Sequence, residues 1–357
     1  MAPKSPFLTA TRTLVRPQLD PEYGTPGRSA WLDVDWPAVT HRTVAAGAEL
    51  TYVDIGSGPG EPIVFVHGLG ASWQSWLENL PHFARRHRCI AMDLPGFGTS
   101  PELEGEVTIR RYGEIVDALL QQLGIPRAAV VGNSMGGFIA AELALRFPTA
   151  VSRLVLVSPA VLWQEYRRAR PLVALAQASD TVLAKALADS SPAVARRPRL
   201  RAALLAFGGF HLPHLLPREL QRELVLTSRR TPGFLPALQA LASYPLRDEL
   251  TDLRVPTLVV WGTDDTLVGA EQADELERLI PGARKIVFAH TGHVAMLERP
   301  ARFNDVMEEF LAEGDVSRAT EAAAADPDDP ADAQRRAAAE ADPSEIELPD
   351  EAPSASA

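Results

Sequence analysis

A chain of 357 residues is long enough for one large domain or two ordinary ones. Its content of 46% hydrophobic and 23% charged residues is typical of a soluble globular protein. The single cysteine, Cys89, excludes an intrachain disulfide, and no apolar run is long enough for a secretory signal or a membrane span, so we expect a cytoplasmic protein.

The formal net charge of −11 lies mostly at the end of the chain. Residues 313–357 hold 13 acidic side chains and three arginines, so the rest of the chain is close to neutral. Almost no large apolar residue follows Gly314, which predicts a disordered acidic tail over residues 314–357. No basic cluster interleaved with aromatic residues indicates nucleic-acid binding, and no nucleic-acid partner is expected.

Strands and helices alternate along most of the chain. Residues 1–40 are rich in proline and form an N-terminal extension, and two short runs around Ala46-Gly47 predict a β-hairpin between residues 41 and 55. Continuous apolar runs predict buried strands at residues 63–66, 89–92, 129–131, 154–157, 257–261 and 284–288. Helical spacing predicts helices through Trp73 and Leu80, over 108–123, up to Phe147, over 270–280 and over 300–311. This order predicts an α/β fold with a mostly parallel, doubly wound sheet.

The alternation stops at Val161 and resumes near Ser243. The stretch between is rich in Leu, Ala, Arg and Pro, which predicts a helical cap inserted into the core. The expected organisation is an extension at 1–40, a first core part at 41–160, a cap at 161–245, a second core part at 246–313 and the tail at 314–357.

The central motif is Gly132-Asn133-Ser134-Met135-Gly136, placed between a predicted strand and a predicted helix. A sharp strand-to-helix turn exposes one side chain, and glycines leave room for neighbouring segments. Ser134 then stands at a helix start, where free N–H groups stabilise negative charge. This pattern predicts a nucleophile elbow.

A serine hydroxyl needs a base, and the base needs an orienting acid. Two later strands end at residues of the right type: Asp264 and Asp265 follow the strand that ends at Trp261, and His290 and His293 follow the strand that ends at Phe288. Carboxyl ends of parallel strands meet at one edge of a sheet, so these groups are expected near Ser134.

The chain resembles capped serine hydrolases of the α/β-hydrolase fold over roughly residues 41–311. Five blocks occur in the family's order: HGLG at His67, DLPGFGTS at Asp93, GNSMGG at Gly132, WGTDDTLV at Trp261 and TGHVAMLERP at Thr291. The resemblance implies a catalytic triad of the nucleophile Ser134, the acid Asp265 and the base His293, with Asp265 preferred to Asp264 by its spacing from Gly262.

The same resemblance implies an oxyanion hole formed by the backbone N–H groups of Leu69 and Met135. It implies that His67 braces the HGLG loop, that Asp93 is structural, and that His290 has no catalytic part. No dinucleotide fingerprint, phosphate loop or metal-spaced His/Cys cluster occurs, so neither a cofactor nor a metal is expected.

The expected partner is a small hydrophobic ester or thioester, because the cap is apolar; the sequence does not indicate an oligomeric state. One alternative is a carbon–carbon bond hydrolase of ring-fission products, which GNSMGG resembles, although Ala71-Ser72 and Val294 depart from that subfamily. The other is a non-catalytic ligand receptor on the same fold.

Overall fold

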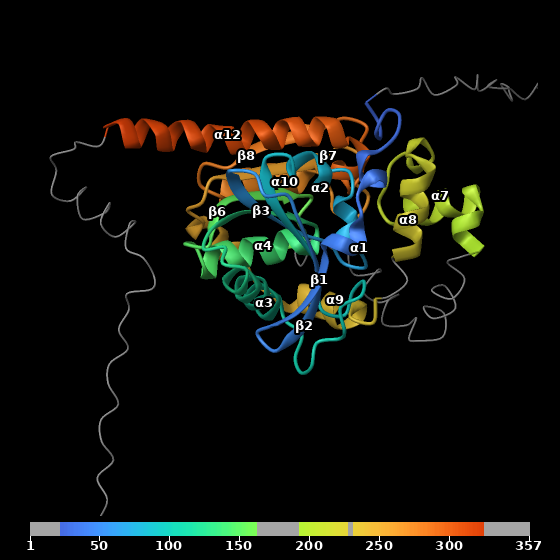
Figure 1. Cartoon of the computed structure of the whole chain (residues 1–357), viewed down its shortest axis with the longest axis horizontal. Helices are drawn as coiled ribbons and strands as arrows, with labels where there is room; N and C mark the ends of the chain where they lie inside the picture. The colour runs from blue at the N-terminus through green and yellow to red at the C-terminus, as the bar shows by residue number, and fades with distance from the viewer. Residues whose placement is uncertain (1–21, 163–192, 228–230, 325–357) are drawn as a thin grey trace, which may run out of the picture. The chain divides into compact units, whose positions relative to one another are not determined.

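A single eight-stranded sheet organises the computed structural model, which describes residues 22–162, 193–227 and 231–324. Figure 1 shows the sheet surrounded by helices. In the order in which they lie side by side, the strands are β1 (Thr40–Ala45), β2 (Ala48–Ile55), β4 (His87–Asp93), β3 (Gly60–Val66), β5 (Ala128–Asn133), β6 (Val151–Val157), β7 (Thr257–Gly262) and β8 (Arg284–Phe288).

The sheet is mostly parallel and doubly wound. β1 and β2 form the predicted hairpin, and β2 pairs antiparallel with β4, whereas the pairs from β4 through β3 to β8 are all parallel. The chain winds from β3 to β4 on one side, then returns to place β5 on the other side of β3. The strand order therefore reverses at β3 and β5, and open α/β sheets bind ligands at such a point.

Both faces of the sheet are covered. In β3, Val64 and Val66 belong to the large core cluster, while Phe65, which points to the other face, packs against the rings of Trp76 and Phe83 at 5.1 and 6.2 Å. Every residue of β5 and of β6 is buried. Outside the insertion between β6 and β7, the longer helices are α3 (Ile109–Gln122), α4 (Met135–Arg146), α10 (Glu271–Leu279) and α12 (Pro300–Ala324). The short ones are α1 (Trp36–Val39), α2 (Leu80–Phe83) and α11 (Ala295–Glu298).

The helix predicted through Trp73 and Leu80 is divided. The structure has a 3₁₀ turn, η2 (Trp73–Trp76), followed by α2. Pro81 lacks an N–H group and cannot donate to the carbonyl of Leu77, so a single α-helix cannot continue through it.

The described part of the N-terminal extension packs on the core. Trp31, in the 3₁₀ turn η1 (Ala30–Asp33), is buried, and its indole N–H donates to the carboxylate of Glu78 at 3.0 Å. Ser29 and Thr25 also donate to Glu78, each at 2.7 Å. This buried carboxylate therefore anchors residues that the sequence assigns only to an extension.

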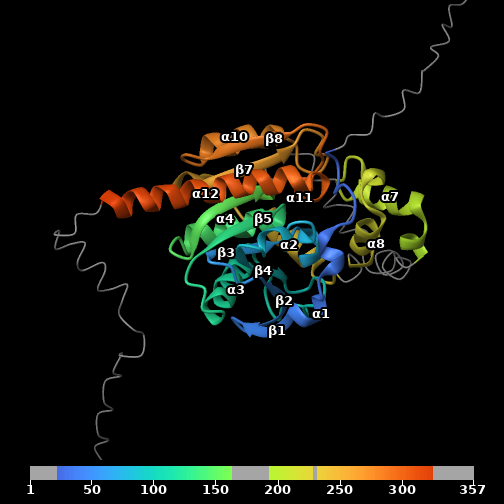
Figure 2. The same cartoon turned by 45° about the horizontal axis from the view of Figure 1, so that its top comes forward.

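The insertion between β6 and β7 is helical where it is described. It holds α7 (Pro198–Phe207), η5 (Pro213–Leu215), α8 (Arg218–Thr227) and α9 (Phe234–Ser243), and both views place α7 and α8 side by side (Figures 1 and 2). Leu238 and Leu241 of α9 are buried in the core cluster. The rest of the predicted cap includes residues 163–192, which lie outside the described residues.

The last helix is longer than the sequence predicts. α12 ends at Ala324, past Gly314, where the acidic tail is expected to begin. Residues 325–357 of the predicted tail lie outside the described residues. Within the described ranges, no helix has both the length and the apolar character needed to cross a membrane.

Candidate active site

Ser134 occupies a strained turn between β5 and α4. Its φ of 54° and ψ of −117° lie in a region that residues with a side chain rarely adopt. The backbone is held there because the Ser134 N–H donates to the carbonyl of Val157 at 3.0 Å. A Cβ atom on Gly132 would stand 2.2 Å from the carbonyl oxygen of Gly136, so only glycine fits there. This geometry is that of the predicted nucleophile elbow.

His293 and Asp265 are brought together by two neighbouring strands. His293 follows β8 and Asp265 follows β7, and Nδ1 of His293 lies 2.7 Å from Oδ2 of Asp265. An ionised carboxylate only accepts hydrogen bonds, so Nδ1 carries the proton and Nε2 is left as an acceptor. The imidazole is 6% exposed and the carboxylate is completely buried, so water does not compete for this bond.

The other oxygen of the Asp265 carboxylate is also occupied. Oδ1 accepts the backbone N–H groups of Leu267 and Val268, each at 2.9 Å. The carboxylate is thereby fixed in one orientation, with Oδ2 directed at His293. Asp264 points elsewhere: its Oδ2 accepts the hydroxyl of Thr263 at 2.7 Å. Of the two neighbouring acids, the structure pairs Asp265 with the histidine, as the spacing predicts.

Asn133 connects the elbow to the histidine loop. Its side-chain amide donates to the carbonyl of His293 and to that of Val157, both at 3.1 Å. Ser134 and His293 therefore stand on adjacent, bonded segments at the carboxyl edge of the sheet. Within the described part of the chain no hydrogen bond joins the Ser134 hydroxyl to His293; such contacts are often long before substrate binds.

The loop after β3 lies directly against the elbow. A Cβ atom on Gly68 would stand 3.1 Å from Cβ of Ser134, and one on Gly136 would stand 2.2 Å from the carbonyl oxygen of Val66. The N–H of Met135 is the first of α4, where no intrahelical acceptor exists. No acceptor for the N–H of Leu69 or of Met135 occurs among the described residues. Two free donors thus flank Ser134.

His67 braces this loop. Its Nε2 accepts the N–H of Leu94 at 3.0 Å, so Nδ1 carries the proton and donates to the carbonyl of Gly68 at 2.8 Å. The ring is fully buried, and this burial lowers the pKa of His67 to about 4. Both ring nitrogens are therefore hydrogen-bonded, which supports the prediction that His67 braces the loop and is not a second base.

Asp93 joins two loops at the end of β4. Its buried carboxylate accepts the backbone N–H groups of Trp73 and Thr99, at 2.9 and 2.8 Å. Burial raises the pKa of Asp93, while these hydrogen bonds act in the opposite direction. A Cβ atom on Gly98 would overlap the carboxylate, so glycine is required there. These contacts support the prediction that Asp93 is structural.

Glu298 is the main site residue that the sequence did not indicate. Its fully buried carboxylate accepts the N–H groups of Gly292, Val294 and His211, at 3.0 to 3.4 Å, and the hydroxyl of Tyr23. Two of these donors flank His293, so Glu298 holds the loop of the histidine. Burial is also the largest cause that raises the pKa of Glu298. The signal that could have revealed it is an acidic residue directly after the apolar run Val294-Ala295-Met296-Leu297.

The insertion also reaches the site. The carbonyl of Gly209 accepts the N–H of His293 at 2.9 Å, and a Cβ atom on Gly209 would stand 2.7 Å from Cβ of His293. The ring of Phe234, at the start of α9, lies 3.2 Å from the position of a Cβ on Gly70, in the loop that carries Leu69. An aromatic side chain therefore lies beside the loop that carries the N–H of Leu69. No sequence signal identifies Gly209.

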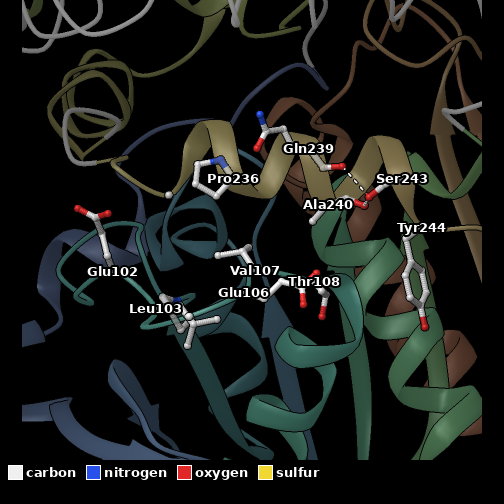
Figure 3. A pocket seen from close by; sticks show the side chains of 13 residues that line it. Glu102, Leu103, Glu106, Val107, Thr108, Pro236, Gln239, Ala240, Ser243 and Tyr244 are labelled. Atoms are coloured by element: carbon white, nitrogen blue, oxygen red, sulfur yellow. Dashed lines mark hydrogen bonds between the residues drawn. The ribbon is translucent and has the colours of Figure 1, made fainter.

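A separate hollow lies between α9 and the loop after β4. Figure 3 shows Leu103 and Val107 of that loop on the side opposite Pro236 and Ala240 of α9. Its volume is about 540 Å³, and neither Ser134 nor the Asp265–His293 pair lines it. It is therefore distinct from the candidate catalytic residues. Among the described residues, the side chains grouped so that they could hold a metal ion are His211, Asp264 and His290.

Comparison with known proteins assigns the chain to a family. The sequence profile of the alpha/beta hydrolase fold matches residues 61–300. The chain is 32% identical over 280 residues to the dihydrolipoyllysine-residue acetyltransferase component of the acetoin cleaving system of Cupriavidus necator, covering 74% of this chain and 67% of that protein. It is 29% identical over 286 residues to the 2-hydroxy-6-oxo-2,4-heptadienoate hydrolase of Pseudomonas putida, covering 76% of this chain and 96% of that protein.

A solved structure gives the same result. The N-acyl homoserine lactone degrading enzyme Est816 superposes with a TM-score of 0.60 at 26% sequence identity, covering 76% of this chain and all of that one. The predicted fold class is confirmed. The catalytic roles of Ser134, Asp265 and His293 stay predictions.

Proposed function

Because the chain belongs to the α/β-hydrolase fold family, we propose that it is a serine hydrolase that cleaves carboxylic esters through an acyl-enzyme on Ser134. The observation that carries the proposal is the buried Asp265–His293 hydrogen bond of 2.7 Å at the same sheet edge as the elbow of Ser134. Together these groups supply a nucleophile, a base and an orienting acid, in the order Ser, Asp, His.

In the acylation step, Nε2 of His293 takes the proton of the Ser134 hydroxyl as its oxygen attacks the ester carbonyl carbon. The imidazolium that forms is stabilised by the carboxylate of Asp265, which stays ionised. The negative charge on the carbonyl oxygen is met by the N–H groups of Leu69 and Met135, each contributing a few kcal/mol. His293 then gives its proton to the leaving alcohol.

In the deacylation step, His293 takes a proton from water, and the resulting hydroxide attacks the acyl carbon. The second tetrahedral intermediate collapses, the acid leaves, and Ser134 recovers its proton. The positive φ of Ser134 matters in both steps, because it holds the hydroxyl oxygen clear of the helix that begins at Met135. None of these steps requires a cofactor.

The proposed substrate carries a hydrophobic acyl or alcohol part. Support comes from the aromatic ring of Phe234 beside the loop of Leu69, and from the apolar character of the insertion. Of the other predicted cap aromatics, Phe210 is buried and Phe207 is 68% exposed, while Trp163 lies outside the described residues. Phe234 is therefore the described side chain best placed to contact the substrate.

The test is turnover of p-nitrophenyl esters from C2 to C12. A buried CH₂ group is worth about 0.8 kcal/mol, so kcat/KM should rise roughly threefold to fourfold per added CH₂ until the pocket is filled. Phe234→Ala should reduce this slope, and Phe207→Ala, the matched control at an exposed position, should leave it unchanged. A profile flat across chain length would contradict the hydrophobic pocket.

A carbon–carbon bond hydrolase is the second candidate, and one observation favours it. The chain aligns with 96% of the length of a dienoate hydrolase from Pseudomonas putida. The discriminating experiment offers the purified protein a 2-hydroxy-6-oxo-dienoate and an ester of similar size, and follows the loss of the coloured dienoate. Faster turnover of the dienoate would replace the ester proposal; turnover of neither would favour the non-catalytic receptor.

A further inference from the structure

Three metal-ligating side chains converge beside the candidate active site. His211 comes from the insertion between α7 and η5, Asp264 follows β7, and His290 follows β8. One ligand atom of each lies within 4.8 Å of those of the other two. We propose that these residues form a binding site for a divalent transition-metal ion of the zinc class, a site separate from the serine hydrolase chemistry.

The separations suit a tetrahedral ion after small side-chain rotations. Nδ1 of His211 lies 3.8 Å from Oδ1 of Asp264. Metal–ligand bonds of about 2.0–2.2 Å place two ligands of a tetrahedral site roughly 3.4 Å apart. Asp264 and His211 are half-buried and His290 is exposed, so an ion can enter and a water molecule can complete its coordination.

The carboxylate of Asp264 and the backbone of His290 are held in place by the same hydroxyl. Thr263 donates through Oγ1 to Oδ2 of Asp264 at 2.7 Å and accepts the backbone N–H of His290 at 3.0 Å. The backbone N–H of Asp264 also donates to the carbonyl of Thr291 at 2.8 Å. Oδ1 of Asp264 remains directed at His211. Partners of this kind orient metal ligands and strengthen binding.

The backbone of His290 is strained in the position that presents its ring. Its φ is +50°, which is costly for a residue with a side chain. His211 is anchored as well, because its N–H donates to Glu298 at 3.0 Å. All three ligands therefore stand on segments that the core fixes, which lowers the entropy lost when an ion binds.

The ligand set selects the ion. Two imidazoles and one carboxylate suit Zn²⁺, Co²⁺, Ni²⁺ and Cu²⁺, whereas Mg²⁺ and Ca²⁺ prefer oxygen ligands. The catalytic candidates do not compete for it, since Asp265 and His293 are bonded to each other. An ion at this site would tie the segment of Gly209 and His211 to the core, and Gly209 already contacts His293.

The test uses the full-length chain, treated with a chelator and free of any histidine tag. Calorimetric titration with Zn²⁺ should give one site per chain, and Co²⁺ should develop the visible absorption of a four-coordinate ion. His211→Ala, His290→Ala and Asp264→Asn should each weaken Zn²⁺ binding by at least about tenfold. His214→Ala is the matched control, because His214 is an exposed histidine of the same segment outside the group.

Each variant is first checked for a native far-ultraviolet circular dichroism spectrum and melting transition, so that loss of binding is not loss of fold. Zn²⁺ should raise the melting temperature of the wild type and of His214→Ala, but not that of His211→Ala or His290→Ala. The proposal is overturned if His211→Ala/His290→Ala binds Zn²⁺ as tightly as the wild type. It is equally overturned if Mg²⁺ competes with Zn²⁺ at equal concentration.

Discussion

Nδ1 of His293 lies 2.7 Å from Oδ2 of Asp265, although 28 residues separate them in the chain. Both side chains are buried, and the second oxygen of Asp265 is held by two backbone N–H groups. The tautomer of His293 is therefore set by the fold, and Nε2 is left free to accept a proton. This relationship is the basis of the proposed mechanism.

The first prediction separates the two neighbouring acids. Asp265→Asn should lower kcat for ester hydrolysis by about a thousandfold or more, because an amide can donate to Nδ1 and favour the wrong tautomer. Asp264→Asn is the matched control and should retain most of the activity, since Asp264 bonds to Thr263. Both are assayed with chelator present. If Asp264→Asn proved the inactive variant, the assignment of the acid would be wrong.

The second prediction concerns the loop of His293. Glu298→Gln replaces one acceptor oxygen of the carboxylate by an NH₂ group. This donor then faces the N–H donor of Gly292 or of His211. The free energy of unfolding should fall by about 1–3 kcal/mol, and kcat should fall with KM little changed. Urea denaturation and ester kinetics measure the two effects. Glu309→Gln, at an exposed position, should change neither; an unaltered kcat in Glu298→Gln would show that the loop is held without it.

A third prediction follows from the pKa of His67. Its value of about 4 in the folded protein lies below the 6.5 of an unfolded histidine, so the unfolded chain binds a proton first. The neutral His67 ring therefore contributes up to about 3 kcal/mol to the free energy of unfolding. This contribution is fully present above pH 6.5 and is lost as the pH falls toward 4. The free energy of unfolding of His67→Asn should lack this component between pH 7 and 4.5.

The control for His67→Asn is the substitution of a histidine that is exposed in the folded protein. His41→Asn, at an exposed position in β1, should keep the pH dependence of the wild type. Parallel curves for the wild type and His67→Asn across this range would contradict the buried, neutral state of His67.

The fourth prediction tests the packing of the elbow. Gly136→Ala places a Cβ atom 2.2 Å from the carbonyl oxygen of Val66, and the backbone of α4 or β3 must move to accept it. Melting temperature and ester turnover should both fall sharply. Gly113→Ala is the control within α3, where the new Cβ meets its nearest neighbour at 3.6 Å. That variant should be as stable as the wild type, or up to about 1 kcal/mol more stable.

The fold could be predicted because local and global signals agree. Apolar runs such as that of β5 are buried on both faces, and the glycines around Ser134 match a turn that excludes larger residues. The helical spacing through Trp73 and Leu80 predicts one helix, but Pro81 has no N–H group to donate, so the chain forms a 3₁₀ turn and then α2. The scarcity of large apolar residues after Gly314 predicts a tail there, whereas α12 continues to Ala324.

The site could be predicted in part, for a physical reason. Ser134 follows β5 directly, and Asp265 and His293 lie in the short loops after β7 and β8, so the sheet brings all three to one edge. Gly209 and His211 reach the same region through the insertion, whose packing no local pattern encodes. The absence of a metal stays a prediction based on spacing along the chain, whereas the proximity of His211, Asp264 and His290 arises only in three dimensions.

The central claim is that Ser134 is the nucleophile and His293 its base, and covalent labelling tests it most directly. A fluorophosphonate should add once per chain, and peptide mapping should place the adduct on Ser134. Labelling should be absent in Ser134→Ala and slowed by orders of magnitude in His293→Ala. The double variant should hydrolyse esters no more slowly than either single variant, because the two groups act as a unit. An adduct on another residue, or ester turnover that survives Ser134→Ala, would contradict the account.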